Sequence, residues 1–173
     1  MLFHLGALWR LSEWGYLKKL ARISSVSGGS ITAGMLGFQW NSLSFDANGQ
    51  VTDFDVTLVQ PIRALASKTI DEASIIGGIF LPGSIADKVA DAYRKNLFGN
   101  AILETLPLDR PRFVINATSV QTGDLFRFSR PYMADYRVGR MMNPKIELAV
   151  AVAASSAFPP VLSPLKLELD PAS

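Results

Sequence analysis

One short segment constrains the fold of this chain more than any other, the octapeptide ISSVSGGS at residues 23–30. An apolar run over residues 20–26 leads into it, and a helix-compatible run over residues 31–40 follows it. A strand, a tight turn that holds a serine and then a helix form the layout of a nucleophile elbow. The turn strains the backbone of its serine, so the neighbouring residues must be small. The octapeptide therefore predicts a strand–turn–helix unit with Ser27 at its apex.

Ser27 is the candidate catalytic nucleophile, and Gly28 is the candidate donor of a backbone N–H to an oxyanion. Gly29 matches the second glycine of the G-x-S-x-G pattern, whereas Ser25 stands where that pattern has its first glycine. The following helix would point its N-terminal N–H groups at the oxyanion, and Ser30 could cap that helix. Ser-Gly-Gly-Ser is also a common loop composition, so an ordinary turn is the alternative. The octapeptide alone leaves both interpretations open.

The composition excludes several kinds of chemistry. The chain contains no cysteine, which excludes a disulfide framework, thiolate catalysis and cysteine metal sites. The only histidine is His4, so a multi-histidine metal site cannot form within the chain. His4 precedes Ser27, whereas the triad of an α/β hydrolase runs Ser, acid, His along the chain. We therefore interpret His4 as a packed helix residue, and we expect neither a metal nor a cofactor.

Charge and hydropathy narrow the class of partner. The net charge of +2 comes from scattered Lys and Arg residues, which do not form a nucleic-acid footprint. Hydrophobic residues make up 49% of the 173 residues and charged residues 18%, which favours one packed globular domain. No uninterrupted apolar stretch reaches the length of a membrane-spanning helix. We expect a cytoplasmic protein that is at most peripheral to the membrane.

Hydrophobic periodicity predicts helices and strands that alternate along the chain. The predicted helices lie at residues 1–14, 31–40, 61–70, 85–98 and 145–156, and the predicted strands at residues 20–26, 112–118, 125–128 and 165–169. Residues 51–59 are either a short strand or irregular, and residues 75–81 form an apolar helix or loop. The alternation favours an α/β layered fold with a largely parallel sheet.

Several segments together resemble the patatin-like phospholipase family. The resembling segments are residues 4–8, 25–30, 116–118, 122–123 and 153–160. They are similar, in the order of the family, to its first helix, its nucleophile elbow, a mid-domain strand with its hairpin, and the helix end that precedes the catalytic aspartate. The second of these, SVSGGS, is close to the Ser-Gly-Gly-Ser variant of the elbow found in some bacterial members.

The resemblance implies a three-layer α/β/α fold with a central, mostly parallel sheet. It also implies a serine lipid acyl hydrolase, a phospholipase or esterase, that cleaves lipid esters with a Ser-Asp dyad and no histidine. Ser27 would attack the ester carbonyl, and the aspartate would accept its proton and later activate water. Backbone N–H groups of a glycine-rich loop, together with that of Gly28, would hold the oxyanion. The substrate would be a lipid ester, in the family's case often at a membrane surface.

Two motifs of the family have no match in these residues. They are a glycine-rich loop before the first helix and an Asp-Gly-Gly or Asp-Gly-Ala motif after the final strand. Asp170 lies near the second place but is followed by Pro-Ala, so we interpret it as a loop aspartate. The resemblance thus implies a partial domain over residues 1–173, incomplete at both ends, with little or no hydrolase activity alone. The alternative is a non-catalytic relative that binds lipid or a protein.

Overall fold

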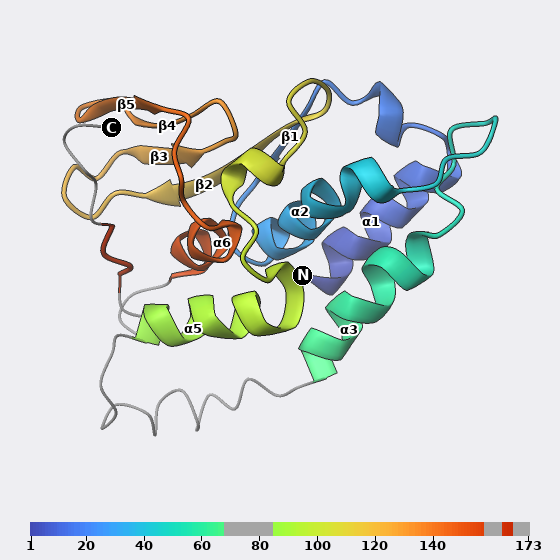
Figure 1. Cartoon of the computed structure of the whole chain (residues 1–173), viewed down its shortest axis with the longest axis horizontal. Coiled ribbons are helices and arrows are strands. Elements are labelled where there is room, and N and C mark those ends of the chain that lie inside the picture. Colours follow the sequence, from blue (N-terminus) through green and yellow to red (C-terminus); the bar gives the residue numbers. More distant parts are fainter. Residues whose placement is uncertain (68–84, 158–163, 168–173) are drawn as a thin grey trace.

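Over the described residues, the sheet of this protein has five strands in the order β1-β2-β3-β4-β5 (Figure 1). The computed structural model describes residues 1–67, 85–157 and 164–167. The strands are β1 (Arg22–Ser25), β2 (Arg112–Thr118), β3 (Leu125–Phe128), β4 (Tyr132–Asp135) and β5 (Gly139–Met142). Strand β1 runs parallel to β2, whereas the pairs β2–β3, β3–β4 and β4–β5 are antiparallel. The described strands therefore do not confirm a mostly parallel sheet.

The connections between the strands explain this mixture. Parallel strands need a long crossover, and the chain between β1 and β2 passes through several helices. The later strands follow one another after short turns, which allow only antiparallel neighbours. Gly123 takes a φ of 73° in the turn between β2 and β3, where a side chain would be strained. The sequence predicted this hairpin but not β4 and β5, since β5 is largely exposed and few apolar residues mark it.

Helices form the second layer of the molecule. They are α1 (Leu2–Glu13), α2 (Gly28–Gln39), α3 (Gln60–Ser67), α5 (Ile85–Tyr93) and α6 (Leu148–Ser156). Two π-helical turns, η3 (Asp55–Val59) and η5 (Arg94–Phe98), adjoin α3 and α5. The 3-10 turns in the described part of the chain are η1 (Leu17–Lys19), η2 (Trp40–Ser42) and η6 (Leu103–Thr105). The fold is α/β, as predicted.

The predicted elements differ from the observed ones mainly at their ends. Helix α2 begins at Gly28, three residues before the predicted start, because the turn leads directly into the helix. Helix α6 begins at Leu148 rather than at residue 145, since Glu147 pairs with Ile102 in an isolated bridge. Residues 55–59 are helical, so the strand alternative for this segment is wrong.

Some predictions reach residues that the structure does not describe. The apolar segment at residues 75–81 lies wholly outside the described ranges, and so do residues 68–70 of the third predicted helix. Of the last predicted strand, residues 165–167 are described and are not in a strand.

Helix α2 is the centre of the core, with nine consecutive buried residues. Its glycines allow close packing, as their spacing predicted. A Cβ on Gly34 would lie 3.1 Å from Val152 of α6. A Cβ on Gly37 would lie 2.7 Å from the Leu106 side chain and 3.1 Å from Phe113 of β2. Helix α2 therefore lies against α6 and β2 at a distance that larger residues would not permit.

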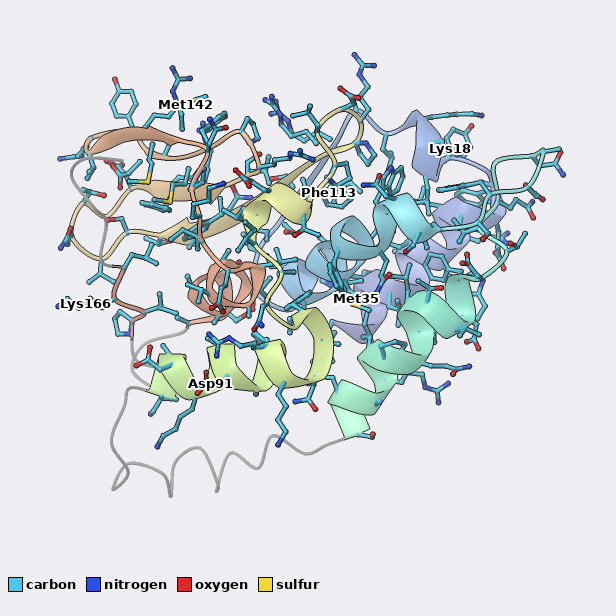
Figure 2. The ribbon with its side chains drawn as sticks, viewed as in Figure 1. Lys18, Met35, Asp91, Phe113, Met142 and Lys166 are labelled. Carbon is cyan, nitrogen blue, oxygen red and sulfur yellow. The ribbon has the colours of Figure 1, made fainter. Side chains whose placement is uncertain are left out.

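The helices that touch the described sheet, α2 and α6, also pack on each other and so cover the same face. The other described helices lie farther out on that side (Figure 1), so the described residues show one helical layer rather than two. Met35 of α2 lies inside this layer, whereas Asp91 lies at its surface (Figure 2). Arg94 ties α5 to α6 through ion pairs with Asp91 and, at 2.7 Å, with Glu147. The hydrogen bond that Arg94 donates to the Glu147 carboxylate is the main cause that raises the pKa of Arg94.

Among the described residues, no helix combines the length and the apolar character needed to cross a lipid bilayer.

Candidate active site

Ser27 stands between β1 and α2 in a backbone conformation that residues with a Cβ rarely adopt. Its φ is 51° and its ψ is −131°. Among the described residues, Asn143 is the other non-glycine residue with a positive φ. Such a conformation costs about 1–3 kcal/mol, so surrounding contacts must maintain it. The side chain of Ser27 is exposed and does not cap the helix, although the residue occupies the N-cap position.

The backbone N–H of Ser27 is held by the C-terminal end of α6. Its nitrogen lies 3.1 Å from the carbonyl oxygen of Ser155 and 3.0 Å from the Ser155 hydroxyl oxygen. The Ser155 hydroxyl in turn donates to the carbonyl oxygen of Asn116 in β2, at 2.6 Å. These bonds join α6, β2 and the turn at Ser27. They are the contacts that stabilise the strained backbone of the turn.

Further serine side chains continue this hydrogen-bond network. Ser30 Oγ lies 2.8 Å from Ser155 Oγ and donates to Ser25 Oγ at 3.0 Å. The amide of Asn116 donates to Ser24 Oγ at 2.9 Å and to the carbonyl oxygen of Ser25 at 3.0 Å. A glycine at position 25, as in the G-x-S-x-G pattern, would offer no hydroxyl to Ser30. The serine that departs from the pattern at position 25 therefore accepts a hydrogen bond that a glycine could not accept.

The role predicted for Ser30 is wrong. Ser30 is the third residue of α2 and is fully buried, so it cannot be the cap of that helix. Its hydroxyl instead bonds toward β1 and α6. The residue at the N-cap is Ser27, whose hydroxyl finds no hydrogen-bond partner among the described residues. The Ser27 hydroxyl thus remains directed at solvent rather than at the helix.

Gly28 leaves its backbone N–H without an acceptor in the described part of the chain. The next two amides in the helix are used, because Gly29 donates to Val26 at 3.0 Å and Ser30 donates to Ser27 at 2.8 Å. A Cβ on Gly28 would lie 2.8 Å from the backbone nitrogen of Met1, a distance that only glycine tolerates. An unused N–H beside Ser27 and the positive end of the α2 dipole meet at this point. Both favour a negative charge next to the Ser27 hydroxyl.

His4 lies on α1, close to the start of α2. Its imidazole is 3.6 Å from the place where a Cβ on Gly29 would be, and its ring meets that of Phe3 edge-on. The side chain is exposed rather than packed inside, which corrects the expectation of a packed residue. None of its described contacts is a hydrogen bond with Ser27.

The described acidic side chains do not hydrogen-bond to Ser27. Asp170, the acid considered from sequence, lies outside the described residues. The carboxylate with a lowered pKa is Asp135, in the hairpin of β4 and β5, because the Thr122 hydroxyl donates to it at 2.7 Å. No group of three or more acidic, cysteine or histidine side chains that could hold a metal ion occurs in the described ranges.

Sequence reasoning missed two parts of this site, Ser155 and Asn116. Both lie in segments that resemble the family, yet neither was considered as a partner of Ser27. They follow it by 128 and 89 positions, taken as 155 − 27 and 116 − 27, so no local pattern links them to the turn. What they share in the sequence is that each is a short polar residue that follows a run of apolar residues.

One of the comparisons with known proteins identifies a family for this chain. A family model described as patatin-like phospholipase matches residues 1–170, which is nearly the whole chain. No curated protein and no solved structure matches the chain. The matched range includes the turn at Ser27 and the segments of α6 and β2 that hydrogen-bond around it. The chain therefore belongs to the patatin-like phospholipase family.

Proposed function

We propose that Ser27 is the nucleophile of a lipid acyl hydrolase of the patatin-like type. The observation that carries the proposal is the strained turn, which presents an exposed hydroxyl beside the N-terminus of α2. A family of lipid acyl hydrolases supplies the class of reaction. In that reaction Ser27 Oγ attacks the ester carbonyl, and an aspartate accepts the hydroxyl proton. Loss of the alcohol leaves an acyl-serine, which water then hydrolyses.

The free N–H of Gly28 supports a role in binding the oxyanion. A tetrahedral intermediate formed on Ser27 Oγ places its negative oxygen near the start of α2. A preorganised backbone donor at such a place contributes roughly 10²–10³ in rate. The same N–H could not serve if it were already bonded, and no described residue accepts it. Glycine at this position is also required by the approach of Met1.

Apolar side chains near the turn support a lipid ester as substrate. Val26, which precedes the proposed nucleophile, is 61% exposed. Phe3 and Leu2 are 83% and 52% exposed at the end of α1 that reaches the start of α2. Exposed apolar groups beside a polar site are typical of surfaces that meet lipid. We infer that acyl chains approach Ser27 from this side, at the surface of a membrane facing the cytoplasm.

The replacement Ser27→Ala tests the proposal in the protein expressed from its whole reading frame. We expect it to abolish ester hydrolysis and covalent labelling by a fluorophosphonate probe, because both need the hydroxyl. Ser42→Ala is the matched control, since Ser42 is also exposed and its hydroxyl bonds, within the described ranges, to Gln39 alone. Labelling that survives Ser27→Ala would overturn the assignment. A wild-type protein that binds lipid vesicles but is neither labelled nor active would establish the non-catalytic alternative. The observation that favours this alternative is that no described carboxylate bonds to Ser27.

A further inference from the structure

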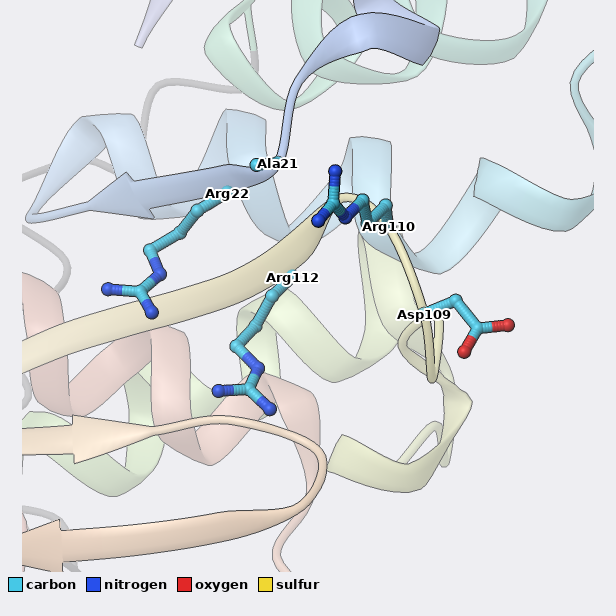
Figure 3. Close-up of a pocket in the computed structure, with 5 residues that line it drawn as sticks. All are labelled: Ala21, Arg22, Asp109, Arg110 and Arg112. Carbon is cyan, nitrogen blue, oxygen red and sulfur yellow. The ribbon is translucent and has the colours of Figure 1, made fainter.

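A hollow at the opposite end of β1 from Ser27 is lined mainly by arginines. Its lining residues are Ala21, Arg22, Asp109, Arg110 and Arg112 (Figure 3). The hollow lies where β1 and β2 begin, whereas Ser27 follows the end of β1. With a rise of about 3.3 Å per residue, Arg22 and Ser27 are roughly 15 Å apart. The hollow is therefore separate from the proposed reaction site.

The register of the sheet forces two of these arginines together. Arg22 of β1 is paired with Arg112 of β2, so their side chains leave the sheet on the same face. Figure 3 shows both guanidinium groups extending in the same direction, with Arg110 at the turn before β2. Like charges that stand directly opposite each other destabilise a sheet unless a counter-charge lies between them.

The described residues supply no such counter-charge. None of the three arginines takes part in any of the described ion pairs or side-chain hydrogen bonds. Asp109 lines the hollow, but its carboxylate points away from the guanidinium groups (Figure 3). Other basic residues are neutralised differently, as Arg94, Arg137 and Lys145 all pair with carboxylates.

We propose that Arg22, Arg110 and Arg112 form a binding site for a phosphate group. A guanidinium presents a planar fork of N–H donors that matches phosphate oxygens, and several forks around one open hollow suit a dianionic group. The site does not depend on the chemistry of Ser27. The phosphate belongs either to a free anion or to the headgroup of an anionic lipid, since both present the same oxygens.

Binding of inorganic phosphate to the 173-residue chain is the first test. Isothermal titration at constant ionic strength should show binding to the wild type. The double variant Arg22→Gln/Arg112→Gln should bind at least about tenfold more weakly, because the loss of a single charge-assisted hydrogen bond already costs about that factor. Arg63→Gln is the control, as Arg63 is an exposed arginine on α3 outside the hollow. The midpoint of thermal unfolding without phosphate should not fall in the double variant, since a repulsion is removed.

Sedimentation with vesicles distinguishes the source of the phosphate. Vesicles of phosphatidylcholine alone are compared with vesicles that also contain phosphatidic acid, for the wild type and both variants. Loss of vesicle binding in the double variant, with no binding of free phosphate by the wild type, assigns the site to a lipid headgroup. If the double variant loses binding of inorganic phosphate but not of vesicles, the site is assigned to a free anion. If it loses binding of both inorganic phosphate and vesicles, the phosphate group itself is recognised. The proposal is overturned if the wild type binds neither ligand, or if the double variant binds as well as the wild type.

Discussion

Ser27 adopts a left-handed backbone although it carries a side chain, and its neighbours show how that is possible. Gly28 removes the Cβ that would meet Met1, and Val26 accepts the N–H of Gly29 to close the turn. The N–H of Ser27 then bonds to Ser155, so the strained residue loses none of its backbone hydrogen bonding. The turn therefore depends on the small size of Gly28, which follows Ser27, and on the hydrogen bonds between Ser27 and Ser155.

Two glycines on different helices should respond to alanine in opposite directions. In Gly37→Ala the new methyl group would lie 2.7 Å from Leu106, and overpacking of a core typically costs about 1–3 kcal/mol. In Gly6→Ala nothing lies within 4 Å of the new methyl group, and alanine stabilises a helix by about 0.5–1 kcal/mol relative to glycine. Urea unfolding of both variants measures these free energies. Equal effects of the two substitutions would show that α2 is not packed as closely as described.

At the scale of elements, α6 and β2 act together as the support of the turn. Helix α6 consists mostly of alanine and valine, so its C-terminal end can approach β2 and the start of α2 closely. Ser155 is the polar residue at that end, and it contacts three other elements through its hydroxyl and its carbonyl. The geometry of the proposed nucleophile therefore depends on a helix far away in the sequence.

Replacing Ser155 should loosen the turn without removing the nucleophile. Ser155→Ala removes the hydrogen bonds that the Ser155 hydroxyl makes with Ser30 Oγ and with the carbonyl oxygen of Asn116, at a cost of about 1–2 kcal/mol in the free energy of unfolding. We also expect slower labelling of Ser27 by a fluorophosphonate probe at a temperature where the variant is fully folded. Ser67→Ala is the control, because the partner of its hydroxyl among the described residues is Ala64 of α3 itself. A loss of stability with an unchanged labelling rate would limit Ser155 to a structural role.

The hairpin of β4 and β5 should make the stability of the protein sensitive to acid. Asp135 is 3% exposed, and donors from Thr122, Arg137 and Val138 stabilise its charged form. The Thr122 hydroxyl is the main cause that lowers the pKa of Asp135 below its usual value. This contribution to stability is complete above the unfolded pKa of about 3.9, and it is lost as the pH falls through the lower folded pKa.

Thermal unfolding between pH 2 and pH 7 tests this link. Asp135→Asn should have a lower midpoint than the wild type at pH 7, and a smaller further loss on acidification. Thr122→Val keeps the Asp135 carboxylate but removes the hydroxyl that lowers its pKa. The acid transition of this variant should therefore lie at a higher pH than that of the wild type. The same dependence on pH in Asp135→Asn and in the wild type would assign the acid sensitivity to other carboxylates.

At the scale of the whole molecule, the proposed nucleophile and the residues that hold it lie where α2, α6 and the first two strands meet. The described part of this arrangement contains no acid bonded to Ser27. The sequence contains neither an Asp-Gly-Gly nor an Asp-Gly-Ala motif. A nucleophile of the proposed type needs such a partner to accept its proton. We therefore propose that residues 1–173 form part of a patatin-like domain.

Purified residues 1–173 should show little or no ester hydrolysis. Loss of the group that activates a serine nucleophile typically lowers the rate by about 10⁴-fold or more. The measurement is turnover of a short-chain ester and of phospholipid vesicles by the wild type and by Ser27→Ala. Turnover by the wild type that disappears in Ser27→Ala would contradict the expectation, and Asp170→Asn would then test the one acid near the family's position.

The sequence by itself determined the local features of this protein. Small residues around Ser27 indicated the turn, apolar periodicity indicated α1, α2 and β2, and the glycines of α2 indicated close packing. These features depend on backbone sterics and on periods of a few residues, which can be recognised in one stretch of chain. Family membership followed from the same local segments in order.

Only the tertiary structure decided which distant residues meet. The bond between Ser27 and Ser155 and the pairing of Arg22 with Arg112 join residues far apart in the chain. The bond between Ser27 and Ser155 depends on how α2 packs on α6, and the pairing of Arg22 with Arg112 depends on the register of β1 against β2. Register and packing are set by the summed contacts of whole elements, which no single motif encodes. The turn at Ser27 is thus a local property, whereas the hydrogen bonds that hold it and the arginine pair at the other end of β1 are properties of the folded chain.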